Sequence, residues 1–236
     1  MKISVLKLLN QARMKRKPAA VITRITDGKQ SLFVDNKIVA GAKVEKPFKT
    51  QIESALMKDV SISIGKAEDR IFINVFNPPK RLILIGAVHI SQALAPMAQT
   101  VGYDVSIIDP RSSFATSERF PNIDLICKWP DEALVNLDID RRTAVVTLTH
   151  DPKIDDPALA SALNSNAFFI GSLGSQKTHG SRLERLQASG FNKDELDRIN
   201  GPVGLNIQAT SPSEIAVSIL AQIIKFSRMP SGDEEA

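Results

Sequence analysis

The stretch RLILIGAVHISQALAPMAQTVGYDVSIIDPR, residues 81–111, has the order of elements found in a β-α-β unit. A continuous apolar run ends at Gly86, a helical segment ends at Gly102, and a second apolar run ends at Asp109. A strand that is apolar at nearly every position is typical of a parallel sheet covered on both faces. The stretch therefore predicts a parallel α/β sheet, and it raises the question of which ligand that sheet binds.

The residues after the first apolar run match the glycine fingerprint of dinucleotide-binding proteins only in part. Gly86 permits the tight turn, and Ser91 is small enough to let helix and strand pack closely. Val88 replaces the glycine that lets the backbone approach a pyrophosphate. Asp109 lies near the spacing of about 20 residues expected of a ribose-binding acid. The pattern predicts the fold, while Val88 argues against binding of NAD(P).

Strands and helices alternate along the chain after residue 81. Further strands are predicted over 104–109, 123–129, 143–149 and 167–174. Helices are predicted over 91–102, 156–165, 179–190 and 193–199, with a last helix from residue 211 onward. Asp156 is the expected N-cap of the helix over 156–165, with Pro157 in its first turn, and Ser211 and Glu214 form a capping box for the last helix. The alternation predicts a Rossmann-like, doubly wound parallel sheet.

The segment before residue 77 has a different pattern. Helices are predicted over 3–14 and 48–58, and short β-rich runs lie at 19–25, 31–35, 37–41, 61–65 and 70–76. Two prolines in NPPKR, residues 77–81, mark a boundary because proline ends the preceding strand and stiffens the connection. We therefore expect a small α+β domain over 1–76, a Rossmann-like domain over 80–228 and an acidic tail over 229–236.

The composition is that of a globular protein of 236 residues, 43% hydrophobic, with a net charge of +4. Basic residues gather only briefly, over 13–17, without interleaved aromatic side chains, so we expect no nucleic-acid partner. No run approaches the roughly 18 apolar residues of a membrane span. The single cysteine, Cys127, excludes an intramolecular disulfide and favours a reducing cytoplasm. It stands in an apolar run, where we expect it to be buried and inert.

Ligands of open parallel sheets bind beyond the carboxyl ends of the strands. The candidates for cofactor binding are the residues at the predicted strand ends: Gly86, His89, Asp109, Arg111, His150, Asp151, Gly171, Ser172, Gly174 and Ser175. All three histidines fall at this edge, His179 being the third. The serine-glycine loop before Lys177 would offer backbone N–H groups and a cation to an anion. The histidines lack the spacing of a metal site, so we predict no metal ligand. Because Cys127 lies in an apolar run, a Cys-His nucleophile pair is not expected, and we predict no catalytic residue.

Several stretches together resemble the C-terminal Rossmann-type domain of the XdhC/CoxI family, from Leu82 to about Arg228. They are IGAVHISQALAPMAQTVGYDVSIIDPR, ERFPN, VVTLTHDPKIDDPALASAL, FFIGSLGSQKTHGSRLERL and INGPVGLNIQATSPSEIAVSILAQII. The resemblance implies an accessory factor for enzymes such as xanthine dehydrogenase. Such a factor binds molybdenum cofactor, a pterin that carries a phosphate, protects it during sulfuration by a cysteine desulfurase, and passes it to a molybdenum hydroxylase apo-enzyme. It also implies a homodimer that acts as a chaperone without turnover.

The sequence departs from that family's pattern at identifiable places. Val88 stands where the family has the second glycine of the turn, and a glycine-serine-proline-arginine-proline loop is missing from the N-terminal part. Lys43, in GAKVE at 41–45, stands where the family has a cysteine. Two alternatives therefore stay open. One is an NAD(P)-dependent oxidoreductase, and the other is an interaction module of molybdoenzyme assembly that has lost its ligand.

Overall fold

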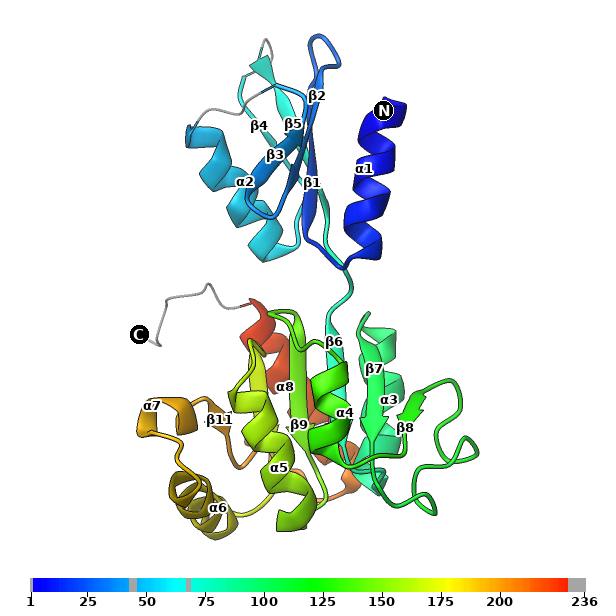
Figure 1. Ribbon diagram of the computed structural model, residues 1–236, viewed down its shortest axis with the longest axis vertical. Coiled ribbons are helices and arrows are strands. Elements are labelled where there is room, and N and C mark those ends of the chain that lie inside the picture. The colour runs from blue at the N-terminus through cyan, green and yellow to red at the C-terminus, as the bar shows by residue number, and fades with distance from the viewer. Residues whose placement is uncertain (1, 43–45, 67–68, 229–236) are drawn as a thin grey trace. The chain divides into compact units, whose positions relative to one another are not determined.

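The computed structural model describes residues 2–42, 46–66 and 69–228 (Figure 1). The chain forms two compact units and passes from the first to the second between Pro78 and Pro79. The predicted acidic tail over 229–236 and the position of Lys43 lie outside the described residues. Each unit has its own sheet and its own hydrophobic core.

The first unit holds a five-stranded antiparallel sheet in the order β3-β2-β1-β5-β4. Its elements are α1 (Ile3–Met14), β1 (Ala19–Arg24), β2 (Gln30–Val34), β3 (Lys37–Ala40), α2 (Lys46–Lys58), β4 (Ile62–Ile64) and β5 (Ile71–Phe76). Every helix and strand expected before residue 77 is present, with ends shifted by at most two residues. The predicted α+β pattern of this segment is confirmed.

A helix covers each face of this sheet (Figure 1). Side chains alternate along the central strand β1, so Ala19 and Val21 face α1 while Ala20 and Ile22 face α2. Leu9 anchors α1 on its side and is 2% exposed. Because both faces are buried, β1 is apolar at consecutive positions instead of alternating with polar residues.

The second unit holds a six-stranded parallel sheet in the order β11-β10-β9-β6-β7-β8. Its strands are β6 (Arg81–Ile85), β7 (Asp104–Ile108), β8 (Asp124–Ile126), β9 (Thr143–Thr147), β10 (Phe169–Ser172) and β11 (Ile199–Asn200). Its helices are α3 (His89–Thr100), α4 (Pro130–Asn136), α5 (Pro152–Leu163), α6 (Gln176–Ala188), α7 (Lys193–Leu196) and α8 (Pro212–Arg228). Counted from β6, the order is the 3-2-1-4-5-6 arrangement of dinucleotide-binding folds. The predicted Rossmann-like sheet is confirmed.

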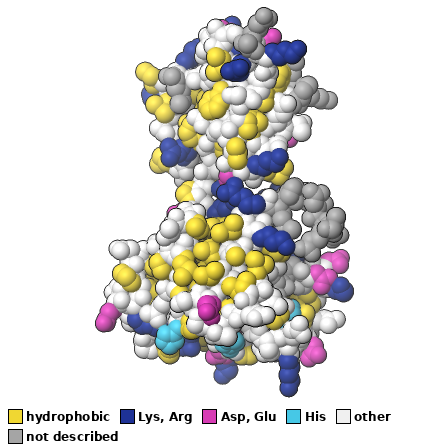
Figure 2. All heavy atoms as spheres, turned by 180° about the vertical axis from the view of Figure 1, so that it is seen from behind, with side chains coloured by type: hydrophobic (Ala, Val, Ile, Leu, Met, Phe, Trp, Pro, Cys, Tyr) yellow, Lys and Arg dark blue, Asp and Glu magenta, His cyan; other side chains and the backbone are white. Residues whose placement is uncertain are grey.

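The helices of the second unit lie in two layers. Helices α3 and α8 pack on one face of the sheet, where Phe169 meets Phe226 edge to face at 5.2 Å. Helices α4 to α7 contribute to the core on the other face. Val101, which follows α3, and Val217 on α8 are about half exposed. Hydrophobic side chains gather on a face of this unit in Figure 2. The switch point of the topology lies between β6 and β9, where the direction of winding reverses.

The start of α5 corrects one prediction. The helix begins at Pro152 with Asp151 as N-cap, whose carboxylate accepts from the N–H of Lys153 at 2.9 Å. The predicted cap Asp156 and first-turn Pro157 therefore lie inside the helix. The earlier start is fixed by Asp155, which is buried and accepts hydrogen bonds from the loop before the helix.

Other differences are smaller. Helix α4 and the two-residue strand β11 were not predicted, and α7 ends at Leu196 instead of continuing to residue 199. Cys127, expected to be buried, is exposed because β8 ends at Ile126 and the chain leaves the sheet there. Its thiol lies 3.8 Å from the carbonyl oxygen of Ala115.

Candidate functional site

The turn between β6 and α3 is built around Gly86. Its φ of +110° is one that side chains disfavour, and a Cβ atom there would lie 2.5 Å from Cγ2 of Thr149. Ser91 is fully buried, and its hydroxyl donates to the carbonyl of Gly86 at 2.5 Å. The turn therefore needs glycine and a small polar residue at these two positions, and it lies against the loop that follows β9.

Val88 is the residue before the first turn of α3. Its backbone is extended, with φ −99° and ψ 176°, and its side chain packs against the core under α3. Nothing in this conformation requires glycine. His89 is the first residue of α3 and is exposed, so its ring stands at a helix N-terminus, where anions are favoured.

The carboxylate of Asp109 is completely buried and its hydrogen bonds stay within the fold. Oδ2 accepts from the N–H of Ala87 at 2.8 Å and from Nη2 of Arg111 at 2.8 Å. Oδ1 accepts from the N–H and from Nε of Arg111, both at 2.9 Å. Burial alone raises the pKa of Asp109, but these hydrogen bonds outweigh it and hold the pKa below its usual value. Four bonds use the acceptor capacity of a carboxylate, so the ribose-binding role suggested by its position would require Arg111 to move.

The loop between β9 and α5 is fixed by hydrogen bonds to Asp155, a residue of α5 that is 1% exposed. Oδ1 accepts from the hydroxyl of Thr149 at 2.7 Å, and Oδ2 accepts from the N–H of His150 at 3.1 Å. These bonds fix His150 in a left-handed conformation with φ +63°, and its side chain is exposed. Burial raises the pKa of Asp155 although its hydrogen bonds and the charge of Arg182 act against the rise.

Three strand ends converge at the switch point. Strand β6 pairs in parallel with both β7 and β9, so the loops after all three strands lie at the same edge of the sheet. Asp109 raises the pKa of Arg111 through its hydrogen bonds, and the charges of Asp151 and Asp155 act in the same direction. The contact of Thr149 with the turn at Gly86 adds the loop after β6. The six predicted residues that belong to these three loops are Gly86, His89, Asp109, Arg111, His150 and Asp151.

The predicted residues after the fifth strand separate into two pairs. Gly171 and Ser172 lie inside the sheet: a Cβ at Gly171 would lie 2.6 Å from Cγ2 of Val203, and the hydroxyl of Ser172 is 2.6 Å from that of Thr147. Both are buried and serve packing. Gly174 and Ser175 directly precede α6, and the Ser175 hydroxyl caps the helix by accepting from the N–H of Thr178 at 3.1 Å.

His179, predicted to lie at the strand edge with the other two histidines, is instead a partly buried residue of a helix. It lies within α6, and its ring packs so closely on Gly201 that a Cβ there would collide with Nδ1, a buried nitrogen. Burial lowers the pKa of His179, and the positive charge of Arg182 lowers it further. Two of the three histidines, His89 and His150, therefore stand exposed at the strand edge.

A polar cavity of about 260 Å³ opens between α5 and α6. It is lined by His150, Pro152, Asp155, Asp156, Lys177, Thr178, Ser181, Arg182 and Arg185. Two of these, Asp155 and Arg182, are buried charged residues that the sequence did not single out. The local signals available were the D-D-P sequence at 155–157 and the series of polar residues on α6, neither of which indicates burial.

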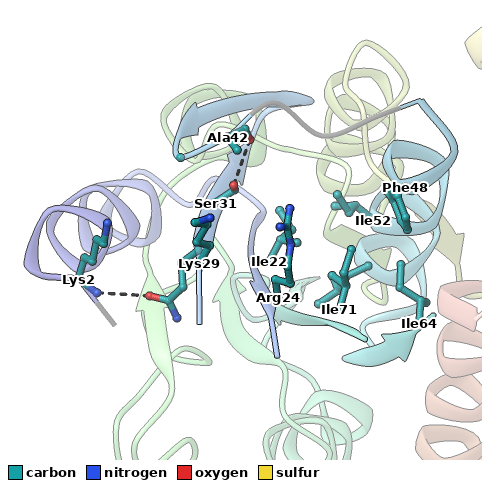
Figure 3. Close-up of a pocket in the computed structure, with 13 residues that line it drawn as sticks. Lys2, Ile22, Arg24, Lys29, Ser31, Ala42, Phe48, Ile52, Ile64 and Ile71 are labelled. Carbon is teal, nitrogen blue, oxygen red and sulfur yellow. Dashed lines mark hydrogen bonds between the residues drawn. The ribbon is translucent and has the colours of Figure 1, made fainter. Parts of the chain in front are cut away.

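The first unit has a cavity of about 300 Å³ between α2 and the sheet (Figure 3). Ile22, Ile64 and Ile71 from three strands and Ile52 and Phe48 from α2 give it an apolar lining. Further lining residues are the basic and polar side chains Lys2, Arg24, Lys29, Gln30 and Ser31. The cavity between α5 and α6 differs in the type of its lining residues, which are charged or polar apart from Pro152.

Two kinds of feature are absent from the described part of the chain. Among these residues no group of three or more His, Cys, Asp or Glu side chains is placed to hold a metal ion. No helix in residues 2–42, 46–66 and 69–228 is long and apolar enough to cross a membrane.

Comparisons with known proteins place this unit in a family. The model of the XdhC Rossmann domain matches residues 82–223. The chain is 33% identical over 148 residues to the molybdenum cofactor insertion chaperone PaoD of Escherichia coli (strain K12), covering 63% of this chain and 40% of that protein. It is 36% identical over 155 residues to a probable xanthine dehydrogenase subunit of Bacillus subtilis (strain 168), covering 65% of this chain and 45% of that one.

A solved structure is similar over both units. A crystal structure described as a xanthine dehydrogenase from Bacillus halodurans aligns with a TM-score of 0.70 and 25% identity, covering 98% of this chain and 66% of that one. The chain spans less than half the length of the two curated relatives named above. The family model covers more than half of the chain and rests on the parallel sheet and strand-end loops described above. The chain therefore belongs to the family that carries the XdhC Rossmann domain.

Proposed function

We propose that this protein is an accessory factor in the maturation of a molybdenum enzyme, and that it binds molybdenum cofactor and delivers it to a molybdenum hydroxylase apo-enzyme. The observation that carries the proposal is the 33% identity to a relative named as a molybdenum cofactor insertion chaperone, within a family match over 82–223. The cofactor is the cargo of such a protein, so the role requires binding and release without chemical turnover.

The chemistry of the strand edge supports binding of such a cargo. A phosphate-bearing pterin needs N–H donors or cations for its phosphate and hydrogen-bonding partners for its polar ring. The N-terminus of α3 at His89, the exposed ring of His150 and the capped N-terminus of α6 at Ser175 provide these at neighbouring strand ends. We assign cargo binding to this edge, with the six residues of the converging loops and the start of α6 as its contacts.

An NAD(P)-dependent oxidoreductase is the second candidate, favoured by the 3-2-1-4-5-6 strand order and the glycine turn at Gly86. The saturated carboxylate of Asp109 argues against it, because a ribose hydroxyl would have to displace Arg111. An interaction module without a ligand is the third candidate. The polar cavity beside α6 favours a ligand-binding protein over such a module.

The partners follow from the same role. We propose a homodimer in the cytoplasm that meets a molybdenum hydroxylase apo-enzyme and a cysteine desulfurase. Affinity capture with the full chain should recover one of these enzymes. Recovery of neither, under conditions where a full-length relative recovers them, would contradict this part of the proposal.

Retention of cofactor through gel filtration tests the function. Purified protein is mixed with molybdenum cofactor released from a molybdoenzyme, and the pterin is followed by fluorescence after oxidation. We expect pterin to elute with the protein, and we expect His150→Ala to retain several-fold less, because the ring is exposed at the strand edge. Lys193→Ala is a matched control, since that lysine is exposed on α7 away from the edge.

The proposal fails if the cofactor elutes as a small molecule from wild-type protein while a full-length relative retains it. A calorimetric titration with NADH and NADPH tests the alternative in the same preparation. Micromolar binding of either nucleotide, with no retention of pterin, would favour the oxidoreductase.

A further inference from the structure

The cavity between α5 and α6 contains a buried cation whose hydrogen bonds are incomplete. Arg182 lines this cavity and is 2% exposed. Its Nη2 donates to the carbonyl oxygen of Leu173 at 2.9 Å. Its Nε and Nη1 are buried and have no hydrogen-bond partner within the described residues. A buried guanidinium normally has its donors satisfied, since each unpaired donor costs free energy, so these two nitrogens point to a missing acceptor.

Helix α6 presents further donors to the same cavity. Lys177, Thr178 and Ser181 line it with an ammonium group and two hydroxyls, and all three are exposed. These residues and Arg182 lie within the first two turns of α6, whose N-terminus begins at Gln176. The partial positive charge at a helix N-terminus and two full positive charges favour a bound anion.

The two carboxylates of the cavity are already engaged. Asp156 accepts two hydrogen bonds from Arg185, at 2.6 and 3.0 Å. Asp155 accepts from Thr149 and from the N–H of His150. Neither carboxylate forms a hydrogen bond or ion pair with Arg182 among the contacts of the described chain. Asp155 acts on Arg182 through its charge alone, so the hydrogen bonds of the described chain leave Nε and Nη1 of Arg182 without an acceptor.

We propose that the cavity between α5 and α6 binds the phosphate group of a phosphate monoester, held by Arg182 and Lys177 and by the hydroxyls of Thr178 and Ser181. A cavity of about 260 Å³ accommodates a phosphate together with ordered water. Arginine suits this role because its planar group offers parallel donors to two oxygens of one anion. The phosphate site is argued from the cavity alone. That its phosphate belongs to molybdenum cofactor rests on the proposed function.

Binding of inorganic phosphate to the full chain tests the site without any cargo. Isothermal titration with phosphate, at constant ionic strength in chloride, is compared between wild type, Lys177→Met and Lys193→Met. We expect wild type to bind phosphate, Lys177→Met to bind at least about tenfold more weakly, and Lys193→Met to bind as wild type. The control lysine is paired with Asp197 on the surface of α7, outside the cavity.

Arg182→Met tests the buried cation. We expect a loss of phosphate binding greater than that of Lys177→Met, with folding checked by circular dichroism and thermal melting. If this variant does not fold, Lys177→Met carries the test, because its side chain is exposed and its removal leaves the core intact. The proposal is overturned if wild type shows no binding up to about 10 mM phosphate, or if Lys177→Met or a folded Arg182→Met binds phosphate as tightly as wild type.

A competition experiment separates the two sources of phosphate. If saturating inorganic phosphate lowers retention of molybdenum cofactor in gel filtration, the phosphate of the cargo occupies the cavity. If phosphate binds and cofactor retention is unchanged, the site stands as one for free phosphate or another phosphate monoester. If phosphate binds and no cofactor is retained at all, the proposed function fails while the site stands.

Discussion

The guanidinium of Arg111 closes over the carboxylate of Asp109 through two charged hydrogen bonds, Nε to Oδ1 at 2.9 Å and Nη2 to Oδ2 at 2.8 Å. The same carboxylate accepts from the N–H of Ala87, so this pair ties the end of β7 to the turn after β6. In many dinucleotide-binding proteins the acid at this place is available to a ribose. Here it stabilises the site's own architecture, which makes its removal a test of stability.

Asp109→Asn should lower the free energy of unfolding by roughly 2 kcal/mol, because the buried amide that replaces the carboxylate has one acceptor oxygen for the donors of Ala87 and Arg111. Urea unfolding followed by circular dichroism measures the change. Glu118→Gln, at an exposed loop position, serves as the control and should stay within about 0.5 kcal/mol of wild type. Equal stabilities of the two variants would show that the pair is not structural.

Gly86→Ala should lower the free energy of unfolding by roughly 3 kcal/mol. An alanine is strained at this positive φ, and its methyl group would also collide with Thr149. Gly102→Ala is a matched control with φ +92° and no atom within 4 Å of the added Cβ. It should cost about 1–2 kcal/mol, from backbone strain alone. Thermal and urea unfolding of both variants give the difference, and identical costs would contradict the contact with Thr149.

The N-cap of α5 can be tested by three substitutions at one position. Asp151→Ala should destabilise the protein by about 1 kcal/mol because the N–H of Lys153 loses its acceptor. Asp151→Asn and Asp151→Ser keep an oxygen that can accept this bond and should retain most of the stability. A similar loss in all three would mean that the charge, and not the cap, is responsible.

The capping box at the start of α8 predicts a dependence on pH. The N–H groups of Ser211 and Thr210 donate to Glu214, and together with the hydroxyl of Thr210 they lower its pKa from 4.5 to about 2. Because the pKa of Glu214 is lower in the folded state than in the unfolded state, its ionised carboxylate stabilises the fold at pH values above 4.5. This contribution is lost as the pH falls from 4.5 towards 2. The Tm of wild type should therefore exceed that of Glu214→Gln at neutral pH, and the gap should close in acid. A constant gap across this range would contradict the assignment.

The exposure of Cys127 predicts rapid reaction with a thiol reagent in native protein. An aromatic disulfide reagent should titrate one thiol per chain without denaturant, at a rate that urea raises by no more than a few-fold. Cys127→Ser should abolish the reaction and leave the Tm nearly unchanged, since the thiol is outside the core. A reaction that occurs only after unfolding would restore the buried position expected from the sequence.

The fold of the second unit was predictable because its strands carry the signal themselves. Leu82 to Ile85 are buried at every position, as a parallel sheet between two helical layers requires. The start of α5 was not predictable, because Asp151-Pro152 and Asp156-Pro157 both place an acid before a proline. The choice between them depends on Asp155, whose partners are defined only once the loop after β9 is folded. Helix α4 carried a signal in Pro130 followed by two acids in the first turn.

The strand-end residues of the candidate site were predictable from the sequence, whereas the buried arginine of the cavity between α5 and α6 was not. Strand ends located Gly86, Asp109 and His150, because the topology brings the carboxyl ends of parallel strands together. Arg182 could not be found in this way. An arginine among polar residues of a helix is usually solvated, and its burial here follows from the packing of α5 against α6.

The carboxylate of Asp155 also determines how the loop after β9 would respond to a ligand. It holds the N–H of His150, while the hydroxyl of Thr149 accepts from the N–H of Asp151 at 3.0 Å, so consecutive residues are fixed before anything binds. A loop that is ordered in the free protein loses little conformational entropy on association, and more of the contact energy then contributes to affinity. The strand edge at His150 is therefore preorganised, and the backbone of this loop should superpose in free and bound forms.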